Sequence, residues 1–175
     1  MKPKFWFLFL VLLTASSCNN PAQPVGYNQG EDYEIYSIVL KEEFGSSSTL
    51  VILRDSTTIS ASSCDSGIAA HFKESLPALQ DETITDFLSA NHNPLKLMPE
   101  MNIDNLVMNF DYDLGAGEET VHVSLSRVGY DSSRTQAIVE VGELRAPLAG
   151  AGCLFLITKQ NGIWRITGRC MTWIA

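Results

Sequence analysis

The sequence lacks an apolar run long enough to cross a membrane as a helix. Its leading run, Phe5 to Leu13, has nine residues, which would rise about 14 Å as a helix against roughly 30 Å of hydrocarbon. Basic residues are also scarce, because 12 Lys and Arg face 20 Asp and Glu for a formal net charge of −8. This balance argues against nucleic acid as a partner and against direct electrostatic adhesion to anionic lipid.

Motifs for catalysis and metal binding are missing as well. His122 and Ser124 alternate onto one strand face, but a nucleophilic serine usually sits in a Gly-x-Ser-x-Gly elbow, which is absent. His71 and Glu74 have metal-ligand spacing on a helix, but a di-iron site needs a second such pair. The run from Gly150 to Gly152 lacks the Lys-Ser ending of a phosphate loop and is more typical of a tight turn. We therefore predict no catalytic residue, metal or cofactor.

What the sequence does have is a clear export signal. Met1 to Lys4 is basic, the apolar run follows, and small residues then lead to Cys18, which is the order of a secretory signal peptide over residues 1–17. A cysteine directly after the small residues resembles a bacterial lipobox, in which the thiol is diacylated. The position three before it is Ala15 instead of the usual Leu, so ordinary cleavage and plain secretion stay open as the alternative.

Residues 18–30 follow as a lipidated cysteine and a polar tether that contains Pro and Gly. The tether reaches at most about 40 Å when extended. Asn19 stands where an inner-membrane retention signal would have Asp, so we expect anchoring at the outer membrane of the cell envelope. Residues 31–175 are then long enough for one domain with a substantial core.

Helical periodicity dominates the first part of this domain. Glu31 to Phe44 has apolar residues at three- and four-residue spacing, with acids in its first turn and Gly45 as a stop. A second helix is predicted around Ile68, Phe72 and Leu76, with Asp65 or Ser66 as its cap, and a third over residues 83–90. Between the first two, residues 49–54 are apolar enough for a buried strand.

From residue 103 the apolar period changes to two, which predicts strands over residues 103–112, 121–126, 137–141, 153–158 and 163–174. Helices first and strands afterwards indicate an α+β fold, in which N-terminal helices pack on one face of a curved antiparallel β-meander. The order is similar to cystatin- and NTF2-type folds by analogy only, and function does not follow from it.

The last two strands flank Asn161-Gly162, a strong hairpin signal. A two-residue loop places Cys153 directly opposite Cys170 as a non-hydrogen-bonded pair, with Cα atoms about 4.5 Å apart, which is within disulfide range. A three-residue loop with a bulge would shift the register and separate the thiols. The two cysteines are therefore either a disulfide or two small buried apolar residues, and Cys64 is expected to be a free thiol.

Three residues are candidates for ligand binding. By alternation, Arg127 shares the face of Val121 and Val123, so its guanidinium is expected either to pair with an acid on a helix or to bind an anion in a concave sheet. His122 and Tyr130 are nearby in sequence and could line the same concavity.

Several short motifs in the C-terminal third, with weaker matches upstream, occur together in a fixed order. The chain thereby resembles a family of uncharacterised bacterial secreted proteins and lipoproteins, for which no function is established. The residues that carry the resemblance are Ser126-Arg127-Val128-Gly129-Tyr130, Leu148-Ala149-Gly150-Ala151-Gly152, Asn161-Gly162-Ile163-Trp164 and Met171-Thr172-Trp173-Ile174. The chain departs from the family by a short acidic turn between Tyr112 and Val121 and by Cys153 where relatives have an aromatic residue.

These observations favour a lipid-anchored envelope protein that binds a small molecule or an envelope protein without catalysis. A small hydrolase or isomerase using the concave sheet face is the alternative, and a purely structural lipoprotein is a third. A pocket with convergent polar groups would favour the enzyme, whereas an exposed apolar patch would favour partner binding.

Overall fold

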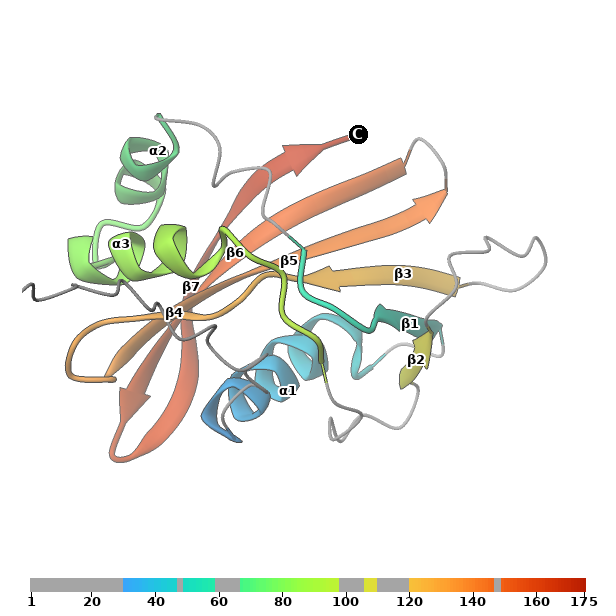
Figure 1. Cartoon of the computed structure of the whole chain (residues 1–175), viewed down its shortest axis with the longest axis horizontal. Helices are drawn as coiled ribbons and strands as arrows, with labels where there is room; N and C mark the ends of the chain where they lie inside the picture. The colour runs from blue at the N-terminus through green and yellow to red at the C-terminus, as the bar shows by residue number, and fades with distance from the viewer. Residues whose placement is uncertain (1–29, 47–48, 59–66, 98–105, 110–119, 147–148) are drawn as a thin grey trace, which may run out of the picture.

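The computed structural model of the protein describes residues 30–46, 49–58, 67–97, 106–109, 120–146 and 149–175. The predicted signal segment, Cys18, most of the tether and Cys64 lie outside these residues. The described elements are α1 Gly30–Phe44, β1 Leu50–Arg54, α2 Ile68–Ser75, α3 Asp81–Ala90, β2 Leu106–Asn109, β3 Thr120–Leu125, β4 Gly129–Tyr130, β5 Gln136–Ala146, β6 Ala149–Gln160 and β7 Ile163–Ile174 (Figure 1).

The three helices form where the apolar periodicity predicts them. In α1 the side chains of Tyr36, Val39 and Leu40 are fully buried, because their spacing places them on one face of the helix. The N–H of Gly45 donates to the carbonyl of Lys41 at 2.9 Å and ends the helix. Helix α2 ends before Pro77, and α3 begins two residues earlier than expected.

The sheet confirms the α+β class but is mixed. Its strand order is β2-β1-β3-β5-β6-β7, with β4 paired to β5. Strand β1 runs parallel to both β2 and β3, whereas the pairs from β3 to β7 are antiparallel. The expected meander is therefore correct only for the C-terminal strands. The reason is that α2 and α3 intervene between β1 and β2, and such a crossover connection permits parallel pairing.

Helices cover both faces of the sheet, not one. The α1 face carries a core formed by α1 with alternate residues of β3, β5 and β6, including Val139 and Phe155. The opposite face carries a second core, in which Phe72 of α2 and Phe87 of α3 pack against Ile138 and Leu156. Figure 1 shows α1 apart from the α2–α3 pair. Because neighbouring strand residues point to opposite faces, both cores use the same strands.

The hairpin forms as predicted, but the cysteine pairing does not. Gln160 pairs with Ile163 around the two-residue loop, and this register holds as far as Ile157 and Ile166. Thr167 is then an extra residue in β7, so Cys153 faces Met171 and Cys170 faces Leu154. The bulge thus moves the two cysteines out of register and onto opposite faces of the sheet. Both are free thiols, so the proposed disulfide is wrong.

The glycines near the start of β6 also differ from expectation. Gly150 and Gly152 lie within the strand and not in a tight turn. The Trp173 ring of β7 lies over them and over Gly142 of β5. A Cβ at Gly152 would collide with the indole nitrogen, and one at Gly142 or Gly150 would lie 3.1 or 3.2 Å from the ring. At Gly152 the ring occupies the space of a side chain, whereas a Cβ at Gly150 would first collide with Leu144 and one at Gly142 with the hydroxyl of Ser124.

Candidate functional site

Of the three candidate residues, Tyr130 is the most firmly enclosed. It belongs to β4, and its side chain is 8 % exposed within the α1-face core. Its hydroxyl donates to Oδ1 of Asp32 at 2.6 Å, and the guanidinium of Arg134 lies 4.4 Å above its ring. Burial and the neighbouring Asp32 charge raise the pKa of Tyr130 far above its usual value. Tyr130 is therefore a poor proton donor or acceptor for catalysis.

Glu31, beside Asp32 in the first turn of α1, connects this tyrosine to the hairpin. Its carboxylate accepts from Lys159 at 2.7 Å and from the Trp164 indole at 3.2 Å, and it pairs with Arg134 at 2.8 Å. The Lys159 ammonium also lies 4.5 Å above the Trp164 ring. We refer to these six residues as the N-terminal cluster: Glu31, Asp32, Tyr130, Arg134, Lys159 and Trp164.

The pKa values of the two carboxyl groups in this cluster are shifted in opposite directions. Burial alone would raise the pKa of Glu31, but hydrogen bonds from Lys159 and Arg134 outweigh it and leave the pKa lowered. For Asp32 burial prevails over the Tyr130 hydrogen bond, so its pKa is raised. These contacts fasten the beginning of α1 to the sheet, and they leave no carboxylate poised for chemistry.

Arg127 follows β3 and is held through its backbone. Its N–H donates to Oδ1 of Asn91 at 2.7 Å, and its carbonyl accepts from Nδ2 of the same residue at 3.0 Å. The positive charge of Arg127 acts on Asp32 and partly offsets the effect of burial on that carboxyl. Among the described residues Arg127 forms no salt bridge, so the structure does not show the predicted ion pair with a helix acid.

His122 does not share a site with Tyr130. It is 4 % exposed, and alternation along β3 turns it away from the α1-face core to which Val121 and Val123 belong. The nearby hydroxyls serve the backbone, because Ser124 donates to the carbonyl of Gly142 at 3.5 Å and Ser126 to that of Arg127 at 3.0 Å. The predicted ligand-binding residues therefore do not converge.

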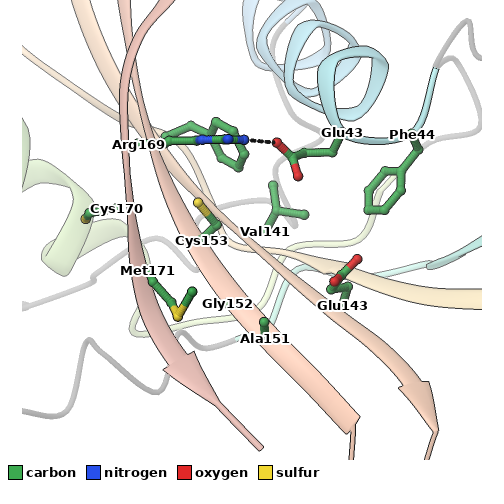
Figure 2. A pocket seen from close by; sticks show the side chains of 11 residues that line it. Glu43, Phe44, Val141, Glu143, Ala151, Gly152, Cys153, Arg169, Cys170 and Met171 are labelled. Atoms are coloured by element: carbon green, nitrogen blue, oxygen red, sulfur yellow. Dashed lines mark hydrogen bonds and ion pairs between the residues drawn. The ribbon is translucent and has the colours of Figure 1, made fainter. Parts of the chain in front are cut away.

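A cavity of about 360 Å³ opens elsewhere, on the α1 face where the helix ends (Figure 2). Small-molecule sites usually have volumes of roughly 300–1,000 Å³. We call this cavity the sheet hollow. It is lined by Glu43, Phe44, Val141, Glu143, Ala151, Gly152, Cys153, Phe155, Arg169, Cys170 and Met171.

The hollow exists because α1 stops before the sheet does. Strands β5, β6 and β7 continue past Phe44, and β6 contributes the small residues Ala151, Gly152 and Cys153 at this point. Their side chains are too short to fill the space beside Val141. Figure 2 shows Val141 and the Cys153 sulfur below the end of the helix. Sequence analysis noted this run of small residues but interpreted it as a turn.

The rim of the hollow is polar and charge-balanced. Arg169 of β7 pairs with Glu43 of α1 at 3.0 Å, and Arg145 pairs with Glu143 at 2.9 Å. Figure 2 shows the Arg169–Glu43 pair across one side of the opening. Each carboxylate on the rim thus has an arginine partner, and the interior below them is apolar.

Neither thiol that lines the hollow is activated, and burial followed by the charge of Glu140 raises the pKa of Cys170. Burial, and to a lesser extent the charge of Glu43, raises the pKa of Cys153 to about 11. A nucleophilic cysteine requires a thiolate, which nearby cations or a helix N-terminus usually stabilise. Within the described residues, no three His, Cys, Asp or Glu side chains gather as a metal site. The arrangement is suited to holding an apolar molecule, not to reacting with it.

A second depression, between α3 and the β4–β5 turn, is lined by acids that already have structural partners. Asp86 accepts from the N–H of Tyr130 at 2.8 Å, and Glu82 accepts from the hydroxyl of Ser132 at 2.8 Å. Asp131 accepts from the N–H groups of Thr135 and Gln136, both at 2.7 Å. These contacts shape the turn, so the sheet hollow is the better candidate site.

Comparison with known proteins adds no family or function. The chain matches no family model, no curated protein and no solved structure. The resemblance to secreted lipoproteins and the analogy to cystatin- or NTF2-type folds therefore stay predictions. Among the described residues, no helix is long and apolar enough to cross a membrane.

Proposed function

We propose that the protein is a lipid-anchored component of the bacterial cell envelope that binds a small, largely apolar ligand in the sheet hollow without catalysing a reaction. The observation that carries this proposal is the hollow itself, an apolar cavity that an otherwise well-filled fold leaves open on the α1 face. An apolar ligand bound there would remove this apolar lining from water, which is favourable.

The anchor part of the proposal is supported by the sequence. Cys18 follows a basic head, a nine-residue apolar run and small residues, and a diacylated cysteine would hold the mature chain at the membrane. Outer-membrane localisation is favoured over the inner membrane by Asn19. Replacing Cys18 with Ser should release the protein from the membrane fraction and abolish incorporation of labelled palmitate. Retention of both properties would contradict lipidation at Cys18, and an unsubstituted protein that is cleaved but takes up no label would indicate plain secretion.

The chemistry of the ligand follows from the lining. Phe44, Val141 and Phe155 offer hydrocarbon and aromatic surface, and Met171, 55 % exposed at the rim, can adapt to different shapes. Because Glu43 and Arg169 pair with each other, the rim presents both signs of charge without a net excess. We expect a ligand with an apolar body in the hollow and a polar group near this pair.

An enzymatic function has less support. The alternative of a hydrolase or isomerase required convergence of Arg127, His122 and Tyr130, but Tyr130 and His122 belong to opposite faces of the sheet. On the face that α2 and α3 cover, Phe72 and Phe87 fill the core, and the buried carboxylate of Glu140 accepts a hydrogen bond from the hydroxyl of Thr172 at 2.5 Å. A site for reaction would need polar groups around the bound molecule.

A matched pair of substitutions tests the hollow. Ala151 lines it, whereas Ala149, two residues earlier in β6, is exposed and does not. Ala151→Leu should fill the cavity, and Ala149→Leu should add the same side chain outside it. The readout is titration with anilinonaphthalene sulfonate, an apolar fluorescent dye with one negative charge. We expect Ala151→Leu to weaken binding about tenfold or more, which corresponds to about 1.4 kcal/mol.

Thermal unfolding of both variants serves as the control for folding. Dye affinity that falls only in Ala151→Leu, with both variants folded, supports the proposal. Equal affinity in the two variants would place the dye elsewhere and count against the hollow as a ligand site. No binding by the unsubstituted mature protein, to the dye or to long-chain fatty acids, would also count against it.

A further inference from the structure

The exposed apolar residues of the described chain have an unusual distribution. Its large exposed hydrophobic side chains, Ile163, Met171 and Ile174, all belong to β7. Met171 lines the sheet hollow, and Ile174 is near the same end of the strand. Ile163 is 55 % exposed at the other end, directly after the Asn161-Gly162 turn. The hollow accounts for the exposure of Met171 but not for that of Ile163.

The surroundings of Ile163 are basic, although the chain as a whole is acidic. Arg165 is exposed two residues further along β7. Lys159 is on the neighbouring strand, and Arg134 shares Glu31 with it. Strand β7 contains two arginines and no acidic residue, whereas the whole sequence has a formal charge of −8. Lys159 and Arg134 share the single carboxylate of Glu31, and Arg165 forms no salt bridge among the described residues, so this end of the hairpin keeps an excess of positive charge. An exposed isoleucine beside such an excess is suited to contact with anionic lipid.

The tether begins beside the same hairpin. Glu31 at the start of α1 binds Lys159 and Trp164, which are the second residue before and the second residue after the Asn161-Gly162 turn. Only residues 19–29 separate α1 from Cys18, and a random-coil chain of that length spans about 20 Å on average. A lipid on Cys18 would therefore keep the hairpin close to the bilayer.

We propose that the β6–β7 hairpin, through Ile163 and Arg165, rests on the anionic phospholipid surface of the membrane that holds the anchor. This inference rests on the proposed lipidation. The hollow lies at the C-terminal end of α1, about 20 Å along the helix from the hairpin, and so faces away from the bilayer. The anchored protein thus presents its ligand site to the aqueous space.

Tethering reconciles this contact with the acidic net charge. One isoleucine and a few basic groups are too little to bring an acidic protein to a membrane from solution. Once Cys18 is anchored, hairpin contact becomes an intramolecular step at an effective concentration in the millimolar range. A weak contact then suffices to orient the domain, because the acyl chains already supply the binding free energy.

The test compares the two ends of β7 on the lipidated protein. Ile163→Cys and Ile174→Cys are labelled with a dye whose emission rises in apolar surroundings, and each protein is reconstituted in vesicles of phosphatidylethanolamine with phosphatidylglycerol. The unsubstituted protein measures background labelling of its own thiols. We expect a roughly twofold or larger rise for the label at position 163 and little change at 174. Molar salt should weaken the effect, because the Debye length falls to about 3 Å.

Charge reversal gives an independent readout. Arg165→Glu should remove most of the rise at position 163, whereas Arg145→Glu, an exposed arginine at the far end of β5, should leave it unchanged. Flotation of the protein with the vesicles distinguishes a failure of the lipid anchor from a failure of the proposed orientation. A protein that does not float overturns the anchor and this inference together. A protein that floats with equal signals at both labels overturns the orientation alone.

Discussion

At its N-terminal end helix α1 is locked to the sheet by charged and aromatic side chains, whereas at its C-terminal end it leaves the sheet hollow. The first end has Glu31 in contact with Lys159, Arg134 and Trp164. At the second, Arg169 of β7 pairs with Glu43 of α1 at the surface, and Phe44 is buried in the α1-face core. The same helix thus packs closely on the sheet at its N-terminal end and leaves a cavity over the same sheet at its C-terminal end.

The difference lies in side-chain size along β6. Near the hairpin this strand contributes Ile157 and Lys159, which reach the helix, and at the other end it contributes Ala151 and Cys153, which do not. Strand β6 stays paired to β5 and β7 along this length, although β7 has an extra residue at Thr172 and β5 an irregularity after Leu144, both at the open end. The comparison indicates that one end of the fold holds the domain together, while the other is free to serve binding.

The largest expected effect on this comparison comes from the tryptophans of β7. Trp164 is 2 % exposed in the filled end, whereas Trp173 lies half-buried over glycines at the other end of β7, on the face of the sheet opposite the hollow. Trp164→Ala should lower the free energy of unfolding by about 3–5 kcal/mol, as is usual for a buried aromatic residue. Trp173→Ala should cost less, because solvent already reaches its ring.

Urea denaturation of the two variants measures both changes, with a constant slope showing that the unfolding transition is comparable. A loss for Trp173→Ala equal to or larger than that for Trp164→Ala would show that the C-terminal end of β7 contributes as much stability as the hairpin end. The conclusion that the hairpin end holds the domain together would then be wrong.

Much of the secondary structure could be predicted because its signals are local. The spacing of Tyr36, Val39 and Leu40 defines α1 without reference to the rest of the chain. Asn161-Gly162 specifies its hairpin because both residues adopt positive φ, at 51° and 81°. These features depend on neighbours within a few residues, which a sequence displays directly.

The features that sequence reasoning missed depend on contacts between distant segments. Nothing local to Thr167 indicates the bulge that separates Cys153 from Cys170. Gly152 was interpreted as a turn residue because the ring of Trp173, which leaves no room for a side chain at this position, lies 21 positions away in the sequence. The parallel pairing of β1 with β2 was missed too, because it depends on where the chain returns to the sheet after α2 and α3.

The candidate site was missed for the same reason. Polar residues such as His122 and Arg127 attract attention in a sequence, whereas the hollow is formed by small and apolar residues. Its existence depends on where α1 ends relative to the sheet, which is a tertiary relationship. A run of small residues inside a long strand is the one signal that could have indicated it.

A smaller effect, with a distinctive pH dependence, is expected from the two acids of the closed end. Glu31→Gln should cost about 0.5–1 kcal/mol at neutral pH, because its ion pairs are partly exposed. The pKa of Glu31 is lowered in the folded protein, so its contribution is present above the unfolded value of about 4.5 and is lost as the pH falls through the folded pKa. The variant and the unsubstituted protein should converge in acid.

Asp32→Asn should show the opposite trend. The pKa of Asp32 is raised because burial disfavours its charge, so the carboxylate destabilises the fold as the pH rises through the folded pKa. Asparagine retains an oxygen to accept from Tyr130, so the variant should gain stability relative to the unsubstituted protein between acid and neutral pH. Unfolding curves at both pH values measure the trends, and parallel behaviour of the two variants would contradict the assigned causes.

The smallest expected effect concerns the thiol of the open end. Because burial raises the pKa of Cys153 to about 11, only a small fraction is thiolate at neutral pH, and a disulfide reagent should modify it slowly. The rate should rise up to about tenfold per pH unit below that pKa. Saturation with a ligand of the hollow should slow the reaction further, since Cys153 lines the cavity. Rapid modification at neutral pH would instead mean that the open end stabilises a thiolate, and a nucleophilic role for Cys153 would then replace simple binding as the better hypothesis for this end of the molecule.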